Sequence, residues 1–506
     1  MVKCRQLSTL LSKRMENKAD PTNWVILKFG GSSVGESKHW QTIADQVKLN
    51  TDKGLRPLLV LSALKNVSNL LEELLHKALA GDHPSAIEHL KRHHLEFASQ
   101  LGLELSQQLS PWFKQLKNDC EQIHQASFIS AKSHAKVVSV GELLSTTIGF
   151  NYLNQHFDSK KIKFCWQDAR LLLKSKRQPT NQNDQWHHYT SAECDYQIDL
   201  KFEEQFTQNS CNELDQNPMV FITQGFIASD ENGDTVLLGR EGSDTSAAYL
   251  GAKLNAQSIQ IWTDVPGVFS CNPQQNNQAK QLKHLNYLEA KQMAQFGAKV
   301  LHPRALQPAT DSAIPLLVKS THHPVETGSL IDKQIKPLPA IKAVVNESPV
   351  IFIKQSIDYK QSLEKLFALG YDIIFKIEDS LTEVTNSATI LHYNNSDMDE
   401  PNLESLTLLF NQNTSIANCT STILNKLALI SIIGTASESE WIQKVKQFCV
   451  NQKQLSLLQL FSSRKQGRVN LLVAEETSEK WCHILHQELI ENERCQNQFG
   501  PGWLDF

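Results

Sequence analysis

The stretch Trp24-Val-Ile-Leu-Lys-Phe-Gly-Gly-Ser-Ser-Val-Gly35 combines residue types that bind phosphate. Its apolar run, bounded by glycine, predicts a buried strand that feeds a tight turn at a helix start. Gly30 and Gly31 let the backbone approach an anion closely. Ser32 can cap the helix, and Lys28 brings a positive charge. Because the lysine precedes the glycines, this is not a Walker loop, and an ordinary strand–turn–helix also fits these residues.

A second strand-to-helix passage, Gly239-Arg-Glu-Gly-Ser-Asp-Thr-Ser-Ala-Ala248, sets an arginine between glycines. The guanidinium of Arg240 can grip a carboxylate through two parallel hydrogen bonds, a geometry that lysine cannot offer. Ser243 and Asp244 fit simple helix capping equally well. The segment is therefore either a capped helix start or a site for a carboxylate.

Three further segments place polar groups at strand ends or helix starts. Trp262-Thr-Asp-Val-Pro-Gly267 suits contacts to a ribose or a base, although a plain β-turn has a similar composition. Phe296-Gly-Ala-Lys-Val-Leu-His-Pro303 sets another lysine beside a glycine, and Ser139-Val-Gly-Glu142 places an acid at the opening of a long apolar helix. Cations and acids at such positions suit phosphoryl transfer, where catalysis is mostly positioning and charge neutralisation.

The composition limits the classes of protein to consider. A chain of 506 residues is too long for one core and predicts about two or three domains. The formal net charge of -4 provides no reason to expect nucleic acid or an anionic membrane as a partner. No apolar run is long enough to span a membrane. The ten cysteines include no C-x-x-C pair, so we expect reduced thiols in a cytoplasmic protein.

Residues 1–23 carry scattered basic side chains around three leucines, Leu7, Leu10 and Leu11. This apolar core is too short and too interrupted for a secretory signal. We expect an N-terminal extension here, with a transit peptide as the alternative.

Strands and helices alternate through the first two thirds of the chain. The predicted strands are nearly continuous in apolar residues and lie at 24–29, 57–63, 219–223, 259–263 and 314–319. Such strands predict a parallel sheet covered on both faces. The candidate motifs come just after strand ends, where ligands bind in open α/β sheets. Residues 80–135 predict a mostly helical insertion over one edge of the sheet.

Past residue 340 the pattern changes to small α+β units, with two units as our interpretation. Strand-like runs lie at 349–353, 372–377, 388–392, 427–433 and 469–473. Predicted helices lie near 359–369, 437–452 and 477–490. A polar stretch at 393–403 predicts a loop or linker between the units.

Together these segments resemble an aspartate kinase of the amino-acid kinase family, nearest to the kinase half of enzymes fused to diaminopimelate decarboxylase. The resemblance covers roughly residues 24–335 and rests on Lys28-Phe-Gly-Gly-Ser-Ser-Val, Ser62-Ala63 with Ser68-Asn69, Gly141-Glu142, Thr223-Gln-Gly-Phe226, Leu238-Gly-Arg-Glu-Gly-Ser-Asp-Thr, Trp262-Thr-Asp-Val-Pro-Gly and Phe296-Gly-Ala-Lys-Val-Leu-His-Pro. It implies a three-layer αβα catalytic domain with a mainly parallel sheet at 24–337. Paired α+β ACT-like, ferredoxin-like domains would follow at 338–506.

The resemblance also implies an activity, the ATP-dependent phosphorylation of the side-chain carboxylate of L-aspartate. This reaction is the first step of lysine, threonine and methionine biosynthesis. Mg²⁺ would bridge the β- and γ-phosphates mainly through water and phosphate oxygens, without protein side chains as metal ligands. The substrate carboxylate is already a nucleophile, so no general base is needed.

The resemblance assigns a role to each matched residue. Lys28, with the amides of Gly30 and Gly31, would stabilise the transferring phosphoryl group, and Asp244 would organise Lys28. Glu142 would hold the amino group of aspartate, and Arg240 its α-carboxylate. The remaining substrate contacts would be Ser68, Gly242 and Ser243. The remaining ATP contacts would be Ser32, Thr263, Asp264, Phe269 and Lys299.

Some positions depart from the family pattern. Gln274 stands where the family usually places an arginine near the nucleotide phosphates, and Glu241 adds an acid beside the carboxylate clamp. The effector-contacting segment of the first ACT unit is not recognisable at 357–361. We therefore expect a homodimer formed through the C-terminal units, while a lysine or threonine effector stays open.

Two other hypotheses remain open. One is a catalytically weak regulatory subunit of the same family that binds amino acids through its C-terminal units. The other is a family kinase that acts on glutamate or on a nucleotide. The matched substrate residues disfavour both.

Overall fold

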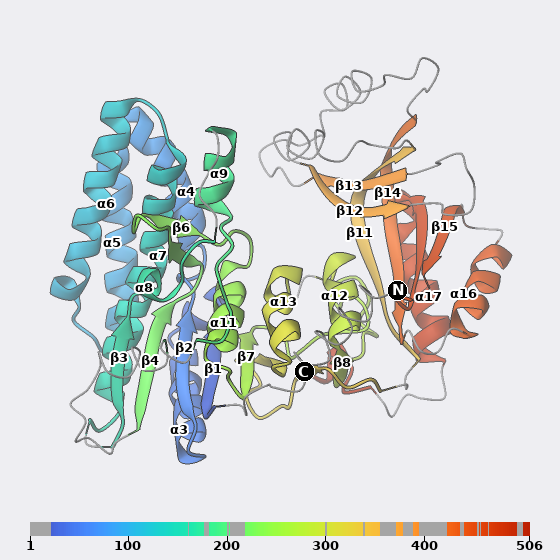
Figure 1. Ribbon diagram of the computed structural model, residues 1–506, viewed down its shortest axis with the longest axis horizontal. Helices are drawn as coiled ribbons and strands as arrows, with labels where there is room; N and C mark the ends of the chain where they lie inside the picture. Colours follow the sequence, from blue (N-terminus) through green and yellow to red (C-terminus); the bar gives the residue numbers. More distant parts are fainter. Residues whose placement is uncertain are drawn as a thin grey trace, which may run out of the picture. The chain divides into compact units, whose positions relative to one another are not determined.

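The computed structural model describes residues 22–159, 161–176, 182–199, 202, 218–298, 301–336, 340–354, 371–377, 388–393, 422–435, 440–452, 455, 457–463, 465–492 and 499–506. The chain forms two compact units, Met1–Gly267 with Leu301–Lys333 and Val268–Val300 with Gln334–Phe506. Each unit is built on a sheet (Figure 1). Within the described ranges, no helix is both long enough and apolar enough to cross a membrane.

The first unit is built on a mainly parallel sheet. Its strands are β1 (Trp24–Phe29), β2 (Arg56–Leu61), β3 (Lys163–Gln167), β4 (Met219–Gln224), β7 (Ser258–Thr263), β9 (Leu316–Ser320) and β10 (Ser329–Asp332). They lie in the order β3-β4-β2-β1-β7-β9-β10, and every neighbouring pair is parallel except β9 and β10. Phe29 pairs with both Leu61 and Trp262, so the carboxyl ends of the central strands are level.

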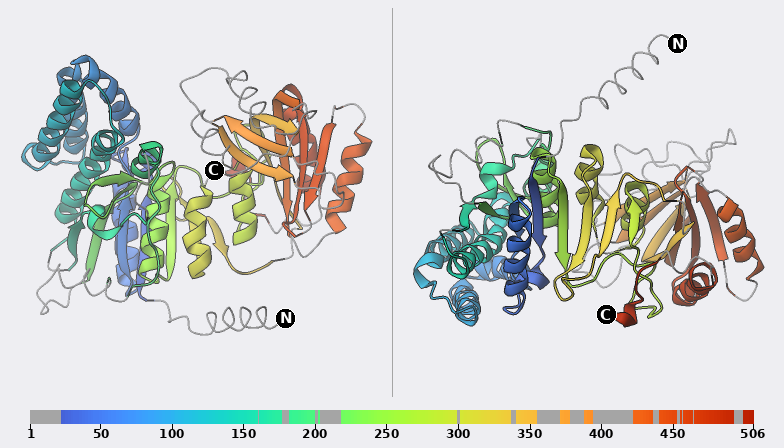
Figure 2. Two further views of the ribbon diagram at one scale, coloured as in Figure 1. Left: turned by 45° about the horizontal axis from the view of Figure 1, so that its top comes forward. Right: turned by 90° about the horizontal axis from the view of Figure 1, so that it is seen from below.

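Helices cover both faces of this sheet (Figures 1 and 2). They are α2 (Gly31–Val34), α3 (His39–Asp52), α4 (Val67–Ala80), α5 (His83–Gln100), α6 (Ser106–Ala126), α7 (Ala131–His156), α8 (Ala169–Leu172), α9 (Gln182–Thr190), α11 (Gly242–Lys253) and α13 (Pro303–Ser312). A hairpin of β5 (Ile227–Ser229) and β6 (Thr235–Leu237) follows β4.

The alternation of side chains along β1 decides which layer each residue meets. Val25, Leu27 and Phe29 join one apolar cluster with buried residues of α3, α4 and α7. Ile26 and Lys28 face the other layer, where Ile26 packs near Gly251 of α11. The predicted three-layer αβα arrangement is confirmed, and it points Lys28 toward α11.

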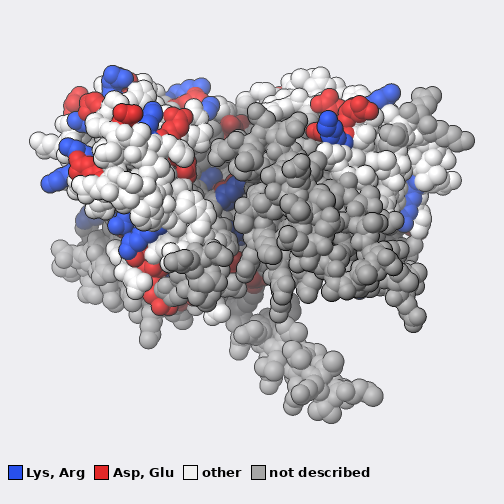
Figure 3. All heavy atoms as spheres, turned by 90° about the horizontal axis from the view of Figure 1, so that it is seen from above, with Lys and Arg blue, Asp and Glu red and all other residues white. Residues whose placement is uncertain are grey.

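The helical insertion predicted at 80–135 is also confirmed. Helices α5 and α6 pack against α4, and α6 packs against α7. Their exposed sides carry acidic and basic side chains close together, as the face drawn in Figure 3 shows. Such a mixture is typical of a solvated helix surface.

Gly149 marks the point where α7 packs most tightly on the layer below it. A Cβ atom at Gly149 would lie 2.5 Å from Cη2 of Trp40 and 2.9 Å from Cδ1 of Leu61, and both residues are fully buried. We expect Gly149→Ala to lower the free energy of unfolding by about 1–3 kcal/mol, because overpacking outweighs the better helix propensity of alanine. Urea unfolding measures this change, and an equal or higher stability would contradict it.

The second unit contains a six-stranded antiparallel sheet in the order β12-β13-β11-β14-β16-β15. Its strands are β11 (Ile341–Lys354), β12 (Tyr371–Ile377), β13 (Ala388–Tyr393), β14 (Thr422–Gly434), β15 (Leu457–Ser463) and β16 (Arg468–Ala474). Its helices are α12 (Tyr287–Gln295), α16 (Glu440–Asn451) and α17 (Ser478–His486), with the shorter helical segments η1 (Glu475–Thr477), η2 (Gln487–Glu491) and η4 (Trp503–Asp505). A short strand, β8 (His284–Asn286), precedes α12.

Helix α17 packs on β11 and β14, and α16 packs on β15 and β16. The predicted α+β character of the C-terminal part is therefore confirmed. Strand β15 was not predicted, because polar residues such as Gln459 interrupt its apolar pattern. The helix predicted at 359–369 lies outside the described residues. Of the linker predicted at 393–403, only Tyr393 is described, at the end of β13.

Candidate active site

A cavity of about 620 Å³ opens at the carboxyl ends of the central strands. The starts of α2, α4 and α11 meet around it, so backbone N–H groups of several helices face one space. Predicted site residues from four separate parts of the chain line it, namely Lys28, Gly31, Ser32, Ser68, Glu142, Arg240, Gly242, Ser243 and Asp244. The structure thus brings together the predicted phosphate site and the predicted carboxylate site.

Lys28 and Asp244 form a buried ion pair at one end of this cavity. Their Nζ and Oδ1 atoms are 2.5 Å apart, and the side chains are 10% and 7% exposed. Asp244 lies in the first turn of α11, where an acid also interacts favourably with the helix dipole. The pair holds the lysine beside the glycine turn, since a Cβ at Gly30 would lie 3.3 Å from Nζ of Lys28.

The glycine turn after β1 is required by close approach of the backbone. The Gly30 N–H donates to the carbonyl of Trp262 at 3.1 Å, which ties the turn to the end of β7. A Cβ at Gly31 would lie 3.1 Å from the carbonyl oxygen of Ala63. At Gly35 it would lie 2.7 Å from the carbonyl oxygen of Gly31. Side chains here would push apart the strand ends that form the cavity.

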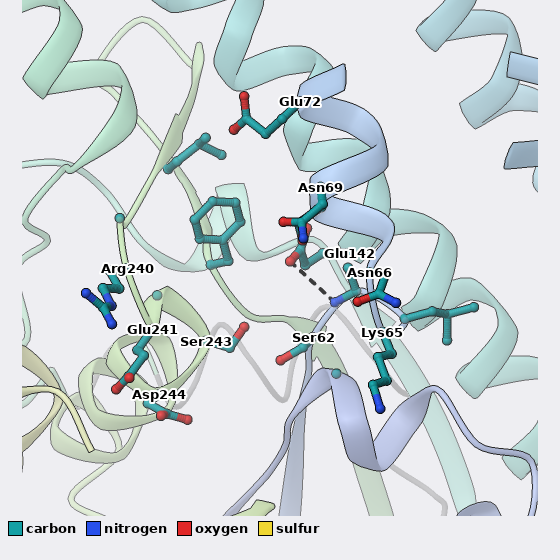
Figure 4. A pocket seen from close by; sticks show the side chains of 18 of the residues that line it. Ser62, Lys65, Asn66, Asn69, Glu72, Glu142, Arg240, Glu241, Ser243 and Asp244 are labelled. Atoms are coloured by element: carbon teal, nitrogen blue, oxygen red, sulfur yellow. Dashed lines mark hydrogen bonds between the residues drawn. The ribbon is translucent and has the colours of Figure 1, made fainter. Parts of the chain in front are cut away.

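Glu142 enters the cavity as a buried carboxyl group from the middle of α7, not from a helix start as predicted, because the helix already begins at Ala131 after the capping residue Ser130. Its Oε1 accepts a hydrogen bond from the Ala63 N–H at 3.3 Å, drawn as a dashed line in Figure 4. Its Oε2 is buried and finds no hydrogen-bond partner among the described residues. Burial raises the pKa of Glu142 to about 8, although the Ala63 hydrogen bond opposes the shift. An unpartnered buried oxygen of this kind suits a cationic ligand.

Gly141 explains how Glu142 reaches this position. A Cβ at Gly141 would lie 3.0 Å from Cβ of Ala63 and 3.1 Å from a methyl group of Val67. The glycine therefore lets α7 come close to the start of α4. This packing carries the Glu142 side chain to the end of β2.

Arg240 and Ser243 lie on the opposite side of the cavity from Glu142 (Figure 4). Arg240 is exposed and follows Gly239, whose φ of 76° requires a glycine-like conformation. Ser243 is buried and packs against Gly225, where a Cβ would lie 2.5 Å from its hydroxyl oxygen. The cavity thus offers a cation on one side and the carboxyl group of Glu142 on the other.

The predicted nucleotide contacts are not all brought together. Thr263 and Asp264 lie at the end of β7, where the threonine hydroxyl donates to the aspartate at 3.0 Å, but neither lines the cavity. Phe269 belongs to the second unit and packs on Trp503, with ring centroids 5.5 Å apart. Lys299 lies outside the described residues. Gln274 also belongs to the second unit, and its N–H donates to Oδ1 of Asn272.

Several cavity residues were missed by sequence reasoning, namely Lys65, Asn66, Glu72, His134 and Thr190. Ser62, Asn69 and Phe226, which also line the cavity, belong to the matched motifs but were given no role. The sequence does hold a signal for Glu72, because it lies one helical turn beyond Ser68 on α4. Oε2 of Glu72 lies 2.9 Å from Nε2 of His134, and this contact links α4 to the start of α7. No such signal pointed to Thr190 or His134.

Fold and site together define a class of protein: a three-layer α/β protein with a glycine turn and a cavity lined by charged side chains at its strand ends. The chain belongs to the amino acid kinase family, whose sequence model matches residues 23–320.

The relatives that the chain resembles are aspartokinases. Lysine-sensitive aspartokinase 3 of Escherichia coli (strain K12) is 31% identical over 322 residues, covering 63% of this chain and 66% of the relative. The chloroplastic bifunctional aspartokinase/homoserine dehydrogenase 1 of Arabidopsis thaliana is 32% identical over 320 residues, covering 62% and 33%. The matched region is thus a third to just under two thirds of the length of these relatives.

Solved structures of E. coli aspartokinase III share the fold. Its R-state complex with aspartate and ADP has a TM-score of 0.70 and 25% identity, covering 92% of this chain and 100% of that chain. Its T-state complex with lysine and aspartate has a TM-score of 0.69 and 25% identity, covering 93% and 100%. The predicted fold class is therefore confirmed for both parts of the chain.

Proposed function

We propose that this protein is an aspartate kinase, which transfers the γ-phosphoryl group of ATP to the side-chain carboxylate of L-aspartate. One observation carries the proposal: a single cavity holds Glu142 and Arg240 on facing sides and the Lys28–Asp244 pair at one end. Glu142 and Arg240 can bind the amino group and the α-carboxylate of an amino acid. Lys28 can stabilise a transferring phosphoryl group. E. coli aspartokinase III, which shares the fold, is known in complex with aspartate and ADP.

In this proposal the substrate amino group satisfies the unpartnered Oε2 of Glu142, and its α-carboxylate binds Arg240. The hydroxyls of Ser68 and Ser243 supply further hydrogen bonds. The side-chain carboxylate then lies toward Lys28 and attacks the γ-phosphorus. The bond from that phosphorus to the bridging oxygen breaks, and ADP leaves. No proton moves in this step, which explains why a general base is not required.

The nucleotide would bind with its phosphates at the glycine turn. Lys28 and the N–H groups of Gly30, Gly31 and Ser32 neutralise charge that grows on the γ-phosphoryl group. Thr263 and Asp264, tied to this turn through the Gly30–Trp262 hydrogen bond, would border the nucleoside. The roles of Phe269 and Lys299 in binding ATP rest on the family resemblance alone.

Mg²⁺ enters the proposal with the nucleotide. The carboxylate of Asp244 is already engaged by Lys28, so phosphate oxygens and water would supply most of the metal ligands. When bound, the ion would neutralise charge on the β- and γ-phosphates.

A coupled assay of ADP release with a panel of amino acids at saturating Mg-ATP tests the proposed function. We expect turnover with L-aspartate and none with L-glutamate, whose longer side chain would misplace the attacking carboxylate. No turnover with aspartate would reject the proposal. Nucleotide binding without turnover of any amino acid would instead indicate the regulatory subunit.

The Arg240→Lys variant tests the carboxylate clamp. We expect the KM for aspartate to rise about ten- to a hundredfold, because losing one charge-assisted hydrogen bond of a bidentate pair costs about 1.5–3 kcal/mol. The kcat should change little, since the clamp binds ground state and transition state alike. A loss of kcat at unchanged KM would assign Arg240 to the phosphoryl group instead.

We also propose a cytoplasmic homodimer joined through its C-terminal units, with a domain boundary near residue 337. E. coli aspartokinase III has been solved with lysine, which makes lysine the first effector to test in an activity titration, followed by threonine. The ten cysteines without a C-x-x-C pair support a reducing compartment.

A further inference from the structure

The carboxylate of Glu241 lines the same cavity, but the proposed reaction gives it no role. Glu241 lies between Arg240 and Gly242, at the residue that precedes the first turn of α11. Its side chain is half-buried, and its Oε2 is buried without a hydrogen-bond partner among the described residues. Sequence reasoning could not say whether this side chain points away from the site. The structure shows that it points in.

The backbone of Glu241 is held in a strained conformation. Its φ of 51° and ψ of 34° lie in the left-handed region, which glycine and asparagine adopt readily and glutamate does not. The side chain also makes no capping hydrogen bond to α11 that would offset the strain. Strain of this kind persists where the surroundings determine the conformation, and it gathers at functional sites.

Charged groups from three directions surround the Glu241 carboxylate. Asp244 faces it from the first turn of α11, Lys28 from β1, and Arg240 precedes it in the chain. A backbone hydrogen bond from His302, just before α13, also reaches it. Burial, followed by the charge of Asp244, raises the pKa of Glu241 to about 7, while Arg240 and Lys28 oppose the rise. The carboxylate therefore changes charge near neutral pH. Figure 4 shows it beside Asp244 and below Arg240.

We propose that Glu241 is a specificity-determining residue that makes binding of the acidic substrate dependent on its own protonation. This inference rests on the proposed function, because it takes Arg240 as the group that receives the substrate α-carboxylate. When ionised, Glu241 competes for the Arg240 guanidinium and repels the incoming carboxylate. When protonated, with a proton taken up from solvent, it removes that repulsion and can donate a hydrogen bond to the ligand.

The direction of the pH effect follows from this charge balance. Binding of an anion beside Glu241 favours its protonated form, so affinity for the anion falls as the pH rises through about 7. Glu142 acts in the opposite direction on aspartate, because its ionised form is the one that attracts an amino group. A ligand with both carboxylates of aspartate but no amino group removes the attraction by Glu142, and a Glu142→Gln background removes the titration of Glu142 from the measurement. Succinate is such a ligand.

The experiment measures the dissociation constant of succinate by calorimetry between pH 6 and pH 8.5, using the full chain with Glu142→Gln and the same chain with Glu241→Gln added. We expect the constant of the chain that keeps Glu241 to rise about tenfold over this range, which corresponds to a shift of one pKa unit on binding. The variant should bind tightly at both pH values and show less than about a twofold change. Glu231→Gln serves as the matched control, because Glu231 is exposed and lies outside the cavity.

Two results would overturn the inference. The first is that adding Glu241→Gln leaves the pH dependence of succinate binding unchanged. The second is a lack of succinate binding at any pH. In that case the assay of aspartate turnover shows whether the proposed function fails as well. If Glu241→Gln does not fold, Glu241→Asn serves instead, since asparagine tolerates the left-handed conformation and removes the same charge. Loss of pH dependence in either variant, but not in the control, would support the inference.

Discussion

The Lys28→Met variant is expected to lose about 10²–10³-fold in kcat, because the group that neutralises charge on the transferring phosphoryl is removed. The same substitution leaves Asp244 as a buried, uncompensated charge 7% exposed to solvent. Breaking a buried ion pair in this way costs about 3–5 kcal/mol of folding free energy. We therefore expect both a loss of activity and a loss of stability, to be measured by steady-state kinetics and by urea unfolding.

The double variant Lys28→Met with Asp244→Asn separates these two effects. Removing both charges leaves no buried ion, so the double variant should regain most of the stability that Lys28→Met loses. It should regain none of the kcat. A double variant that regains activity would show that Lys28 acts only by neutralising Asp244. A Lys28→Met variant with near-normal kcat would show that Lys28 does not stabilise the transferring phosphoryl group.

The Glu142→Gln variant is expected to bind aspartate far more weakly while gaining stability. The amino group of the substrate would lose its buried anionic partner, which costs about 2–5 kcal/mol, or about 30- to several-thousandfold in affinity. Proton release should accompany aspartate binding to the wild type near pH 8, since the amino group favours the ionised carboxylate. Calorimetry in buffers of different ionisation enthalpy measures both quantities.

The stability gain follows from the raised pKa of Glu142. Its pKa is about 8 in the folded protein against an ordinary value of 4.5, so the folded state holds a proton that the unfolded state releases. Stability of the ligand-free wild type therefore falls as the pH rises from about 4.5 to about 8, by up to about 1.4 kcal/mol per pH unit. Glutamine stays neutral, so the variant should lack this decline and be the more stable protein at pH 8.

Unfolding midpoints between pH 5 and pH 8.5 test this behaviour. Glu231→Gln again provides the control, because Glu231 is exposed and lies outside the cavity. Its pH profile of stability should follow that of the wild type through this range. If Glu142→Gln were no more stable than the wild type at pH 8, this would show that ionisation of the buried Glu142 does not lower the free energy of unfolding as we infer.

The fold was predictable because its signals are local. The apolar run before Lys28 and the glycines after it suffice to predict a buried strand and a tight turn, and the structure places β1 and α2 there. The strand pattern also predicts that the following motifs share one edge of the sheet. Phe269 shows the limit of this reasoning: it follows the same strand-end motif as Asp264, but the contacts of its ring lie in the second unit with Trp503.

The sequence by itself determined the strand ends, the glycine turns and the identity of the charged groups, since each depends on residues close together in the chain. The contact of Lys28 with Asp244 was expected only from the family resemblance, because no local pattern joins two residues so far apart in sequence. Only the tertiary structure decided that Oε2 of Glu142 has no partner among the described residues and that Glu241 lines the cavity, because both depend on how the helices pack. Burial by those distant segments also shifts the pKa values of the two glutamates, which no local pattern encodes.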